Sequence, residues 1–268
     1  MSALFDTIKK RRSVRTFDDN PLNDAHTKDL KEYIKDITNP FDIPVEFVIL
    51  DAKEKGLSSP VLSGEKLYVA GKVEKKPYAD VAFGYSFEKL VLHACELGIG
   101  TVWIGGTMKR DVFEKAAEVN PGEMMPCVSP LGYPAKKKSL KETMMRKGVG
   151  ADSRKPQEEL FFDKAWGTPL VPDEDMSIIL EMVRWAPSAV NKQPWRIITK
   201  DGMWHFYEKK DRGYENEATG DLQKVDVGIG LCHFIMGLEE NGKKASVKID
   251  DPGIKIPEDA EYIVSVMV

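Results

Sequence analysis

Basic side chains gather near the start of the chain, within residues 9–15. Arg11, Arg12 and Arg15 flank the hydroxyl of Ser13 there. Guanidinium groups form forked, charge-assisted hydrogen bonds with phosphates, and each such bond contributes about 1.5–3 kcal/mol. Cations also suit the end of a helix, so a solvated basic helix end is the plainer interpretation. The Arg-Arg-Ser-x-Arg pattern nevertheless favours binding of a terminal phosphate, which offers several oxygens.

A second polar segment, residues 185–195, connects a predicted helix to a predicted strand. Pro187 ends the helix, and Ser188, Asn191 and Gln193 follow on a loop that a second proline closes. These short side chains both donate and accept hydrogen bonds, as recognition of a heterocycle with alternating C=O and N–H groups requires. Ser, Asn and Pro are also common in ordinary loops. Their density here favours a binding function.

Two weaker signals accompany these segments. Gly105 and Gly106 follow the strand-like residues 101–104, and their lack of a side chain would let backbone N–H groups approach a flat ligand. Arg154 follows Ser153 and adds another cation next to a hydroxyl. A plain turn and a surface charge explain these two features equally well when each is taken alone.

The rest of the sequence argues against several other kinds of function. HExxH, GxSxG, P-loop and GxGxxG motifs are absent, and the four histidines are scattered, so we expect no metal site. His93 and His233 lie in apolar segments, where we expect core residues. A net charge of −4 argues against a general nucleic-acid binder. The longest nearly apolar run, Val227 to Leu238, is too short to span a membrane.

Composition indicates an ordinary ordered protein. The 268 residues are 42% hydrophobic and 31% charged, which is enough apolar material for a substantial core. The three cysteines form no CxxC pair, and this pattern fits a reducing cytoplasm better than a disulfide scaffold.

The elements that would position these residues occur twice. Long apolar helix patterns start near residues 81 and 225, and at an offset of 144 residues Gly84 corresponds to Gly228. Each pattern ends at a glycine, where a left-handed helix cap is expected, and continues into a strand-like stretch. The paired glycines lack Cβ atoms, so the two helices are predicted to cross closely.

A shorter helix, a loop, a proline and a strand precede each long helix. Residues 28–34 lead to the strand 45–50, and residues 178–184 lead to the strand 195–199. We therefore interpret the chain as two copies of one α+β unit, residues 1–152 and 153–268. The basic residues 135–150 between them are expected to form a surface connection.

Together, these segments resemble the FMN-dependent nitroreductase family. The resemblance covers most of the chain and is carried by residues 11–15, 97–106, 131–135, 154–160 and 186–195. It implies an α+β fold with mixed sheets flanked by helices. In that family FMN lies at a homodimer interface, where the arginine segment of one subunit holds the phosphate and the PSxxNxQP loop of the other holds the ring. Hydride passes from NAD(P)H to the flavin and then to a nitro compound or quinone.

The sequence departs from the family in the placement of its motifs. The family carries the PSxxNxQP loop soon after the first helices, but residues 37–44 occupy that place here and keep only the final proline. The intact loop lies in the second copy, which lacks the arginine segment. One complete site split between two copies is what a fused pseudo-dimer would retain. We therefore expect a monomer acting as a pseudo-dimer with one FMN.

The resemblance assigns roles residue by residue. The residues implied to bind the FMN phosphate and ribityl chain are Arg11, Arg12, Ser13, Arg15 and Arg154. The residues implied to contact the ring and ribityl chain are Pro187, Ser188, Asn191 and Gln193, while Gly105, with Gly106 beside it, presents a backbone N–H toward flavin N5. No catalytic residue is named, because the cofactor carries the chemistry.

The resulting expectation is a cytoplasmic FMN-dependent oxidoreductase that takes electrons from NAD(P)H and passes them to a small-molecule acceptor. No membrane or nucleic-acid partner is expected. A flavin reductase or a reductive dehalogenase on the same scaffold stays an alternative, as does a non-enzymatic protein that binds or sequesters FMN. A nucleic-acid protein with a basic patch is a third class, and it would show no visible absorbance.

Overall fold

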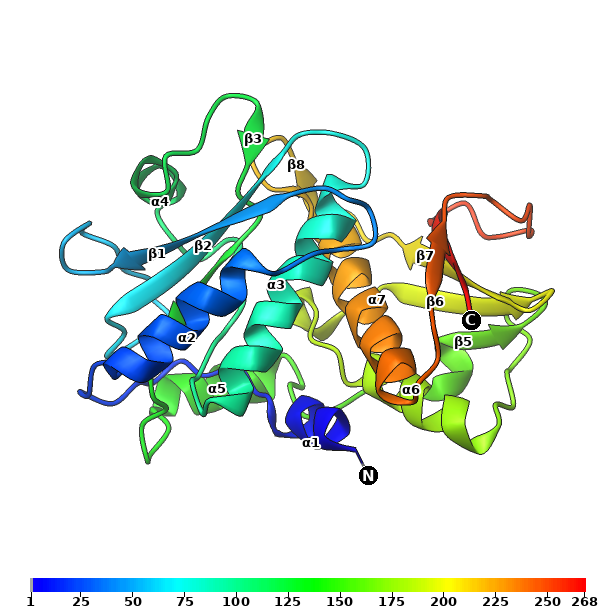
Figure 1. The fold of residues 1–268 in the computed structure, drawn as a ribbon, viewed down its shortest axis with the longest axis horizontal. Helices are drawn as coiled ribbons and strands as arrows, with labels where there is room; N and C mark the ends of the chain where they lie inside the picture. The colour runs from blue at the N-terminus through cyan, green and yellow to red at the C-terminus, as the bar shows by residue number, and fades with distance from the viewer. Residues whose placement is uncertain (1) are drawn as a thin grey trace.

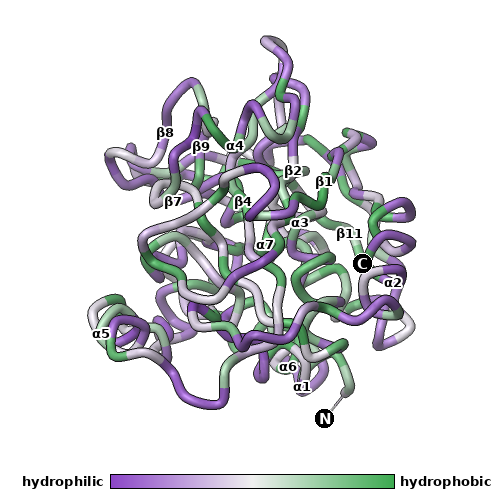
Figure 2. The backbone as a smooth tube through the Cα atoms, turned by 90° about the vertical axis from the view of Figure 1, so that its left-hand side faces the viewer, coloured by the Kyte–Doolittle hydropathy of each residue, from purple (hydrophilic) through white to green (hydrophobic). Residues whose placement is uncertain are grey.

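Two long helices lie side by side at the centre of the computed structural model, which describes residues 2–268. They are α3 (Ala79–Glu96) and α7 (Leu222–Glu240), and both are almost entirely buried. Figure 1 shows one sheet on each side of this helix pair. In Figure 2 hydrophobic segments run along α3 and α7, whereas the loop bearing β8 is hydrophilic. Within residues 2–268, no helix has both the length and the apolar character needed to cross a membrane.

The two helices cross at their paired glycines, as the sequence predicts. A Cβ atom on Gly84 would lie 2.0 Å from the carbonyl oxygen of Val225, and one on Gly228 would lie 2.1 Å from that of Val81. No side chain fits at either distance, so the backbones can approach this closely only through glycine. Both predicted helix caps are also confirmed, because Gly98 and Gly242 have φ values of +75° and +70°.

The N-terminal half builds an antiparallel sheet, on the left in Figure 1. Its strands are β1 (Val45–Asp51), β2 (Leu67–Glu74), β3 (Glu123–Met124) and β4 (Val128–Leu131). β2 is central and pairs with each of the other three. Two further helices belong to this half, α2 (Asp24–Lys35), which packs on α3, and α4 (Arg110–Ala116).

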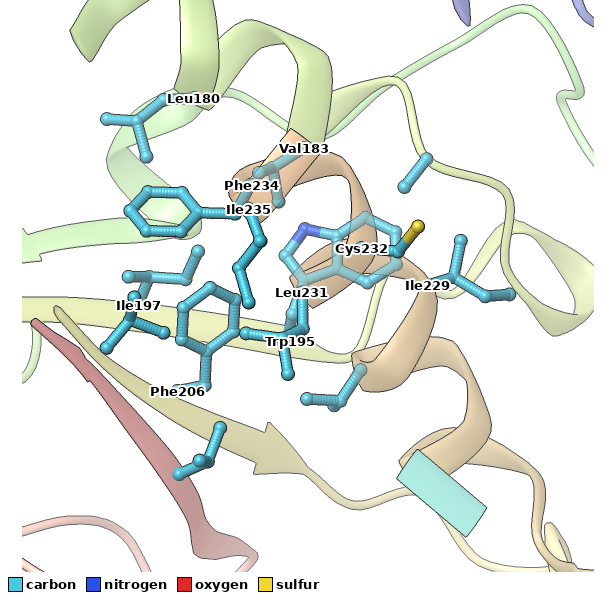
Figure 3. Close-up of a cluster of buried hydrophobic side chains, with 14 of the residues drawn as sticks. Leu180, Val183, Trp195, Ile197, Phe206, Ile229, Leu231, Cys232, Phe234 and Ile235 are labelled. Atoms are coloured by element: carbon cyan, nitrogen blue, oxygen red, sulfur yellow. The ribbon is translucent and has the colours of Figure 1, made fainter. Parts of the chain in front are cut away.

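The C-terminal half builds a mixed sheet in the order β10-β11-β7-β6-β5. In that order its strands are Ser246–Lys248, Ala260–Met267, Met203–Lys209, Trp195–Lys200 and Phe161–Asp163. Only β5 and β6 pair in parallel. The helix α6 (Glu174–Arg184) packs on α7, and Trp195, Phe206 and Phe234 fill the space between sheet and helices (Figure 3).

Strand order confirms the internal duplication. The run β4-β2-β1 in the first half matches β11-β7-β6 in the second. Residues 101–104 stand where β10 stands in the second half, but the strand predicted there is wrong. This segment forms only isolated bridges: Gly100 and Ile104 bridge Gly132 and Val128 on one side, and Thr101 bridges Ser13 on the other.

The remaining elements join the halves. α1 (Ala3–Lys10) packs against α3, α6 and α7, and α5 (Leu140–Gly148) lies in the basic connection. Short elements complete the chain: η1 (Gln157–Glu159), η2 (Ala189–Asn191), β8 (Glu215–Asn216) and β9 (Gly220–Asp221). The connection is more than the predicted surface segment, because Glu142 of α5 is buried and Met145 and Val149 line a cavity.

Candidate functional site

A cavity of about 430 Å³ lies beside α7, between residues from both halves. This volume is within the range of small-molecule sites. Nine of the eleven residues predicted for the site line it: Arg11, Ser13, Arg15, Gly105, Gly106, Arg154, Pro187, Ser188 and Asn191. Segments about 180 residues apart in the sequence therefore meet around one space. Within residues 2–268, no group of His, Cys, Asp and Glu side chains is arranged to hold a metal ion.

Three arginines converge on this cavity. The Nε atoms of Arg11, Arg15 and Arg154 are buried, and none has a hydrogen-bond partner within residues 2–268. Burial lowers the pKa of all three guanidinium groups, because the charged form loses its contact with solvent. The pKa of Arg154 falls to about 10, and the positive charges of Arg11 and Arg184 add to that decrease. A buried donor without a partner costs about 1–3 kcal/mol. The cluster is thus suited to an anionic ligand.

Arg12 is one of the two predicted residues that do not line the cavity. Its Nη1 atom donates to Glu142 Oε1 at 3.1 Å. The other oxygen of Glu142 accepts from the backbone N–H of Arg15 at 3.2 Å and from the hydroxyl of Thr16 at 2.9 Å. Glu142 therefore fixes α5 to the arginine segment, and Arg12 supports the wall from behind.

The loop after Pro187 is held by its own polar side chains. The Ser188 hydroxyl accepts from the Gln193 backbone N–H at 2.9 Å, and Asn191 Nδ2 donates to the Gly150 carbonyl at 2.8 Å. Gln193 is buried beneath the loop, where its Oε1 accepts from the Lys155 backbone N–H at 2.9 Å. Gln193 is therefore the second predicted residue that does not line the cavity.

Backbone strain is concentrated in this loop. Val190, Asn191 and Gln193 have φ values of 49°, 57° and 50°. Asn tolerates the left-handed region, but a β-branched residue such as Val does not, and each strained residue costs about 1–3 kcal/mol. Strain of this kind persists where the surroundings impose it, and it gathers at ligand sites.

The glycine turn is fixed in the cavity wall by an arginine outside the predicted set. Arg110 donates to the carbonyl of Gly105 at 2.7 Å and to that of Met125 at 2.6 Å. A Cβ atom on Gly105 would lie 3.4 Å from the Leu222 side chain, whereas one on Gly106 would have no neighbour within 4 Å. The backbone of this turn therefore stays bare on the cavity side of Gly106.

Several lining residues escaped the sequence analysis. Asp226 of α7 is buried, and its carboxylate accepts from the Ala189 backbone N–H at 3.0 Å. Burial raises its pKa well above the usual range, and the nearby charges of Asp221 and Glu208 add to that shift. One feature of the sequence could have identified Asp226: it is an acidic residue within an apolar helix pattern. Such a residue is expected to be buried and to have a hydrogen-bond partner. Trp103 and Tyr214 also line the cavity.

The corresponding loop of the first copy has joined the core. Phe41, at the place of Asn191, stacks on Tyr78 with ring centroids 5.8 Å apart and packs against both large core clusters. Asn39 is buried and donates to the Ser86 hydroxyl at 3.1 Å. Aromatic side chains thus fill the space that polar groups line in the second copy.

These observations test whether the residues fit the expected FMN. The unpartnered arginine donors fit a phosphate, because guanidinium groups match its oxygens. The polar loop and the bare glycine turn fit the flat, hydrogen-bonding ring, and the cavity volume suits a small molecule. The site and the cofactor are compatible in charge, size and chemistry.

Comparison with known proteins places the chain among nitroreductases. Residues 3–238 match the protein family described as "Putative TM nitroreductase". A Thermotoga maritima protein described as a "putative nitroreductase" is 21% identical, with a TM-score of 0.63, and the match covers 99% of this chain and 94% of that one. This similarity shows that the two proteins share a fold.

Two shorter structures match about half of the chain. A nitroreductase family protein from Clostridium difficile is 16% identical, with a TM-score of 0.46, over 59% of this chain and 96% of its own. A nitroreductase from Bacteroides fragilis, solved with bound FMN, is 20% identical, with a TM-score of 0.44, over 52% of this chain and 92% of its own. No curated protein matches the sequence.

Proposed function

Because the chain belongs to this nitroreductase family, we propose that it binds FMN and works as an FMN-dependent oxidoreductase. The observation that carries the proposal is the convergence of Arg11, Arg15 and Arg154 on one cavity, each with a buried Nε that has no hydrogen-bond partner in residues 2–268. The phosphate of FMN would supply acceptors for these donors, and the strained polar loop would face the remainder of the ligand.

Each part of the cavity has a distinct task in this proposal. The three arginines and Ser13 bind the phosphate, whereas Arg12 holds Glu142 and so keeps α5 in place. Ser188 and Asn191 shape the loop that lies along the ribityl chain and ring. The turn at Gly105 and Gly106 offers backbone N–H groups to the ring, and Arg110 keeps the turn fixed. Gln193 supports the loop from below.

The bound flavin would take hydride from NAD(P)H and pass electrons to a small nitro compound, quinone or similar acceptor. The protein contributes orientation and a positive environment, which stabilises negative charge that develops near the glycine turn. No side chain is assigned as a general acid or base.

We further propose that one chain forms the whole site. Residues 1–152 supply the arginine segment and the glycine turn, and residues 153–268 supply the loop and the face of α7. The chain would then act as a monomeric pseudo-dimer. A cytoplasmic location fits its three free cysteines.

The absorption spectrum of the purified protein tests this proposal. We expect a yellow protein with flavin bands, or one that turns yellow after FMN is added and the excess is removed. Under anaerobic conditions NADH or NADPH should bleach these bands, and a quinone or nitro compound should restore them. A protein that stays colourless after FMN addition would refute the proposal. A yellow protein that neither nicotinamide bleaches would be a flavin binder without turnover.

A further inference from the structure

A buried pair of titratable side chains lies next to the cavity, at the crossing of the central helices. Glu88 of α3 and His233 of α7 are both fully buried. Their Oε1 and Nε2 atoms are 3.0 Å apart, and His233 Nδ1 lies 2.8 Å from the carbonyl oxygen of Met182 in α6. A carbonyl oxygen only accepts, so Nδ1 donates to it and Nε2 faces the carboxylate. The imidazole is thereby fixed between three helices.

The same carboxylate reaches two residues of the cavity wall. Glu88 Oε2 accepts from the indole N–H of Trp103 at 3.2 Å, and Glu88 Oε1 lies 4.0 Å from Arg11 Nε. The side chain of Arg11 is only 6% exposed, and Glu88 is the carboxylate within ion-pair distance of it. A buried guanidinium needs a nearby negative charge to offset its desolvation. Glu88 therefore supplies negative charge beside the buried side chain of Arg11.

This network is confined to the side of the molecule that carries the cavity. At the internal offset of 144 residues, Glu88 corresponds to Cys232, His233 to Lys89 and Trp103 to Val247. None of the counterparts can rebuild the carboxylate–imidazole–indole contacts. A network needed only to hold two duplicated helices together would have no reason to be one-sided, because the glycine crossing itself is symmetric.

We propose that Glu88, held by His233, is the positioning residue of the cofactor site, and that it orients Arg11 toward the bound ligand, while the indole N–H of Trp103 donates to the same carboxylate. The identity of the ligand as FMN rests on the proposed function, but the positioning role concerns contacts within the chain itself. Glu88 acts through Arg11, so its effect on ligand binding should depend on that arginine.

A double-mutant cycle on FMN affinity tests this dependence. Glu88→Gln preserves the shape of the side chain and removes its charge, and we expect it to weaken FMN binding about tenfold. In the Arg11→Ala background the same substitution should change affinity by less than about twofold. Cys232→Ala, at the symmetry-related position, serves as the control and should leave FMN affinity unchanged. An equal loss in both backgrounds, or no loss in the Glu88→Gln single variant, would overturn the proposal.

A second readout needs no flavin. In the protein without FMN, the indole N–H resonance of Trp103 should shift in Glu88→Gln and stay in place in Cys232→Ala, because only the first substitution changes its acceptor. If wild type binds no FMN but this resonance shifts, the proposed function fails and the positioning contact stands. An unshifted resonance would overturn the positioning role whether or not FMN binds.

Discussion

At the scale of single residues, the site is defined by partly buried cations. The Nε atoms of Arg11, Arg15 and Arg154 are buried and have no hydrogen-bond partner in the described chain, and Glu88 lies within ion-pair distance of Arg11. Burying such groups costs stability that folding must supply elsewhere. The cost is understandable if the groups serve a ligand, since an anion would then complete their hydrogen bonds.

Removing single arginines should separate phosphate binders from wall residues. Arg15→Ala and Arg154→Ala should each weaken FMN binding about 10- to 100-fold, because each removes charge-assisted hydrogen bonds of about 1.5–3 kcal/mol. Arg12→Ala is the control, since its guanidinium contacts Glu142. Quenching of flavin fluorescence measures the three affinities. If Arg12→Ala lost as much FMN affinity as the other two variants, lining the cavity would not distinguish the arginines that bind phosphate.

A buried acid outside the cavity should shape the dependence of stability on pH. Glu208 of β7 is 1% exposed, and burial, with the charge of Asp221 adding to it, raises its pKa to about 8 from a model-peptide value of 4.5. The folded chain therefore keeps this proton between about pH 4.5 and 8 while the unfolded chain has lost it. The contribution of protonated Glu208 to the free energy of unfolding is therefore complete below about pH 4.5. It is lost as the pH rises from there to about 8.

Glu208→Gln should accordingly reduce the fall in stability between pH 5 and pH 8. Asp80 and Asp226 also have raised pKa values, so the fall should shrink rather than vanish. Urea unfolding at both pH values measures the change, and a substitution of the exposed Glu258, Glu258→Gln, provides the control. A pH dependence identical to that of wild type in Glu208→Gln would contradict the assignment of a raised pKa.

At the scale of elements, the crossing of α3 and α7 depends on two missing side chains. Gly228→Ala would place a Cβ atom 2.1 Å from the Val81 carbonyl oxygen, so the helices would have to separate. We expect a loss of about 3 kcal/mol or more in the free energy of unfolding. Gly230→Ala in the same helix meets its nearest atom at 3.5 Å and should be neutral or stabilising by up to about 1 kcal/mol. Chemical denaturation measures the free energy of unfolding of both variants. An equal change in Gly228→Ala and Gly230→Ala would refute the close crossing of α3 and α7.

The two copies of the polar loop should respond in opposite ways. Asn191→Ala removes the bond to the Gly150 carbonyl at a left-handed position, and we expect FMN binding to weaken about tenfold. Phe41→Ala in the first copy removes a partly buried side chain that packs against the core, and should cost about 1–2 kcal/mol of stability with little effect on FMN affinity. Titration and thermal unfolding of both variants provide the test. Comparable losses of FMN affinity would contradict a divided role for the loops.

The sequence predicted the elements that have a strong pattern. Apolar periodicity and terminal glycines located α3 and α7, and nine of the residues predicted for the site line one cavity. Arg12 and Gln193 do not line the cavity. A motif states residue type, whereas the direction of a side chain depends on partners such as Glu142 and Lys155, which lie far away in the sequence. Asp226 and Glu88 were missed because their partners come from other elements.

At the scale of the whole molecule, we propose that duplication provided two potential sites and that divergence left one. The strand order repeats in both halves, but the arginine segment belongs only to the first half and the polar loop only to the second. Phe41 and Tyr78 fill the corresponding position of the other copy. A homodimer with the same architecture would need two chains to form such a site, whereas here both halves of one chain line the cavity.

The number of flavins per chain tests this account most directly. A sample saturated with FMN and freed of excess should be denatured, and the released flavin should be measured against protein concentration, with light scattering of the intact sample giving its mass. The account predicts one FMN per chain in a particle of 30.1 kDa. Two FMN per chain, or a monomer that binds flavin only after it dimerises, would contradict it.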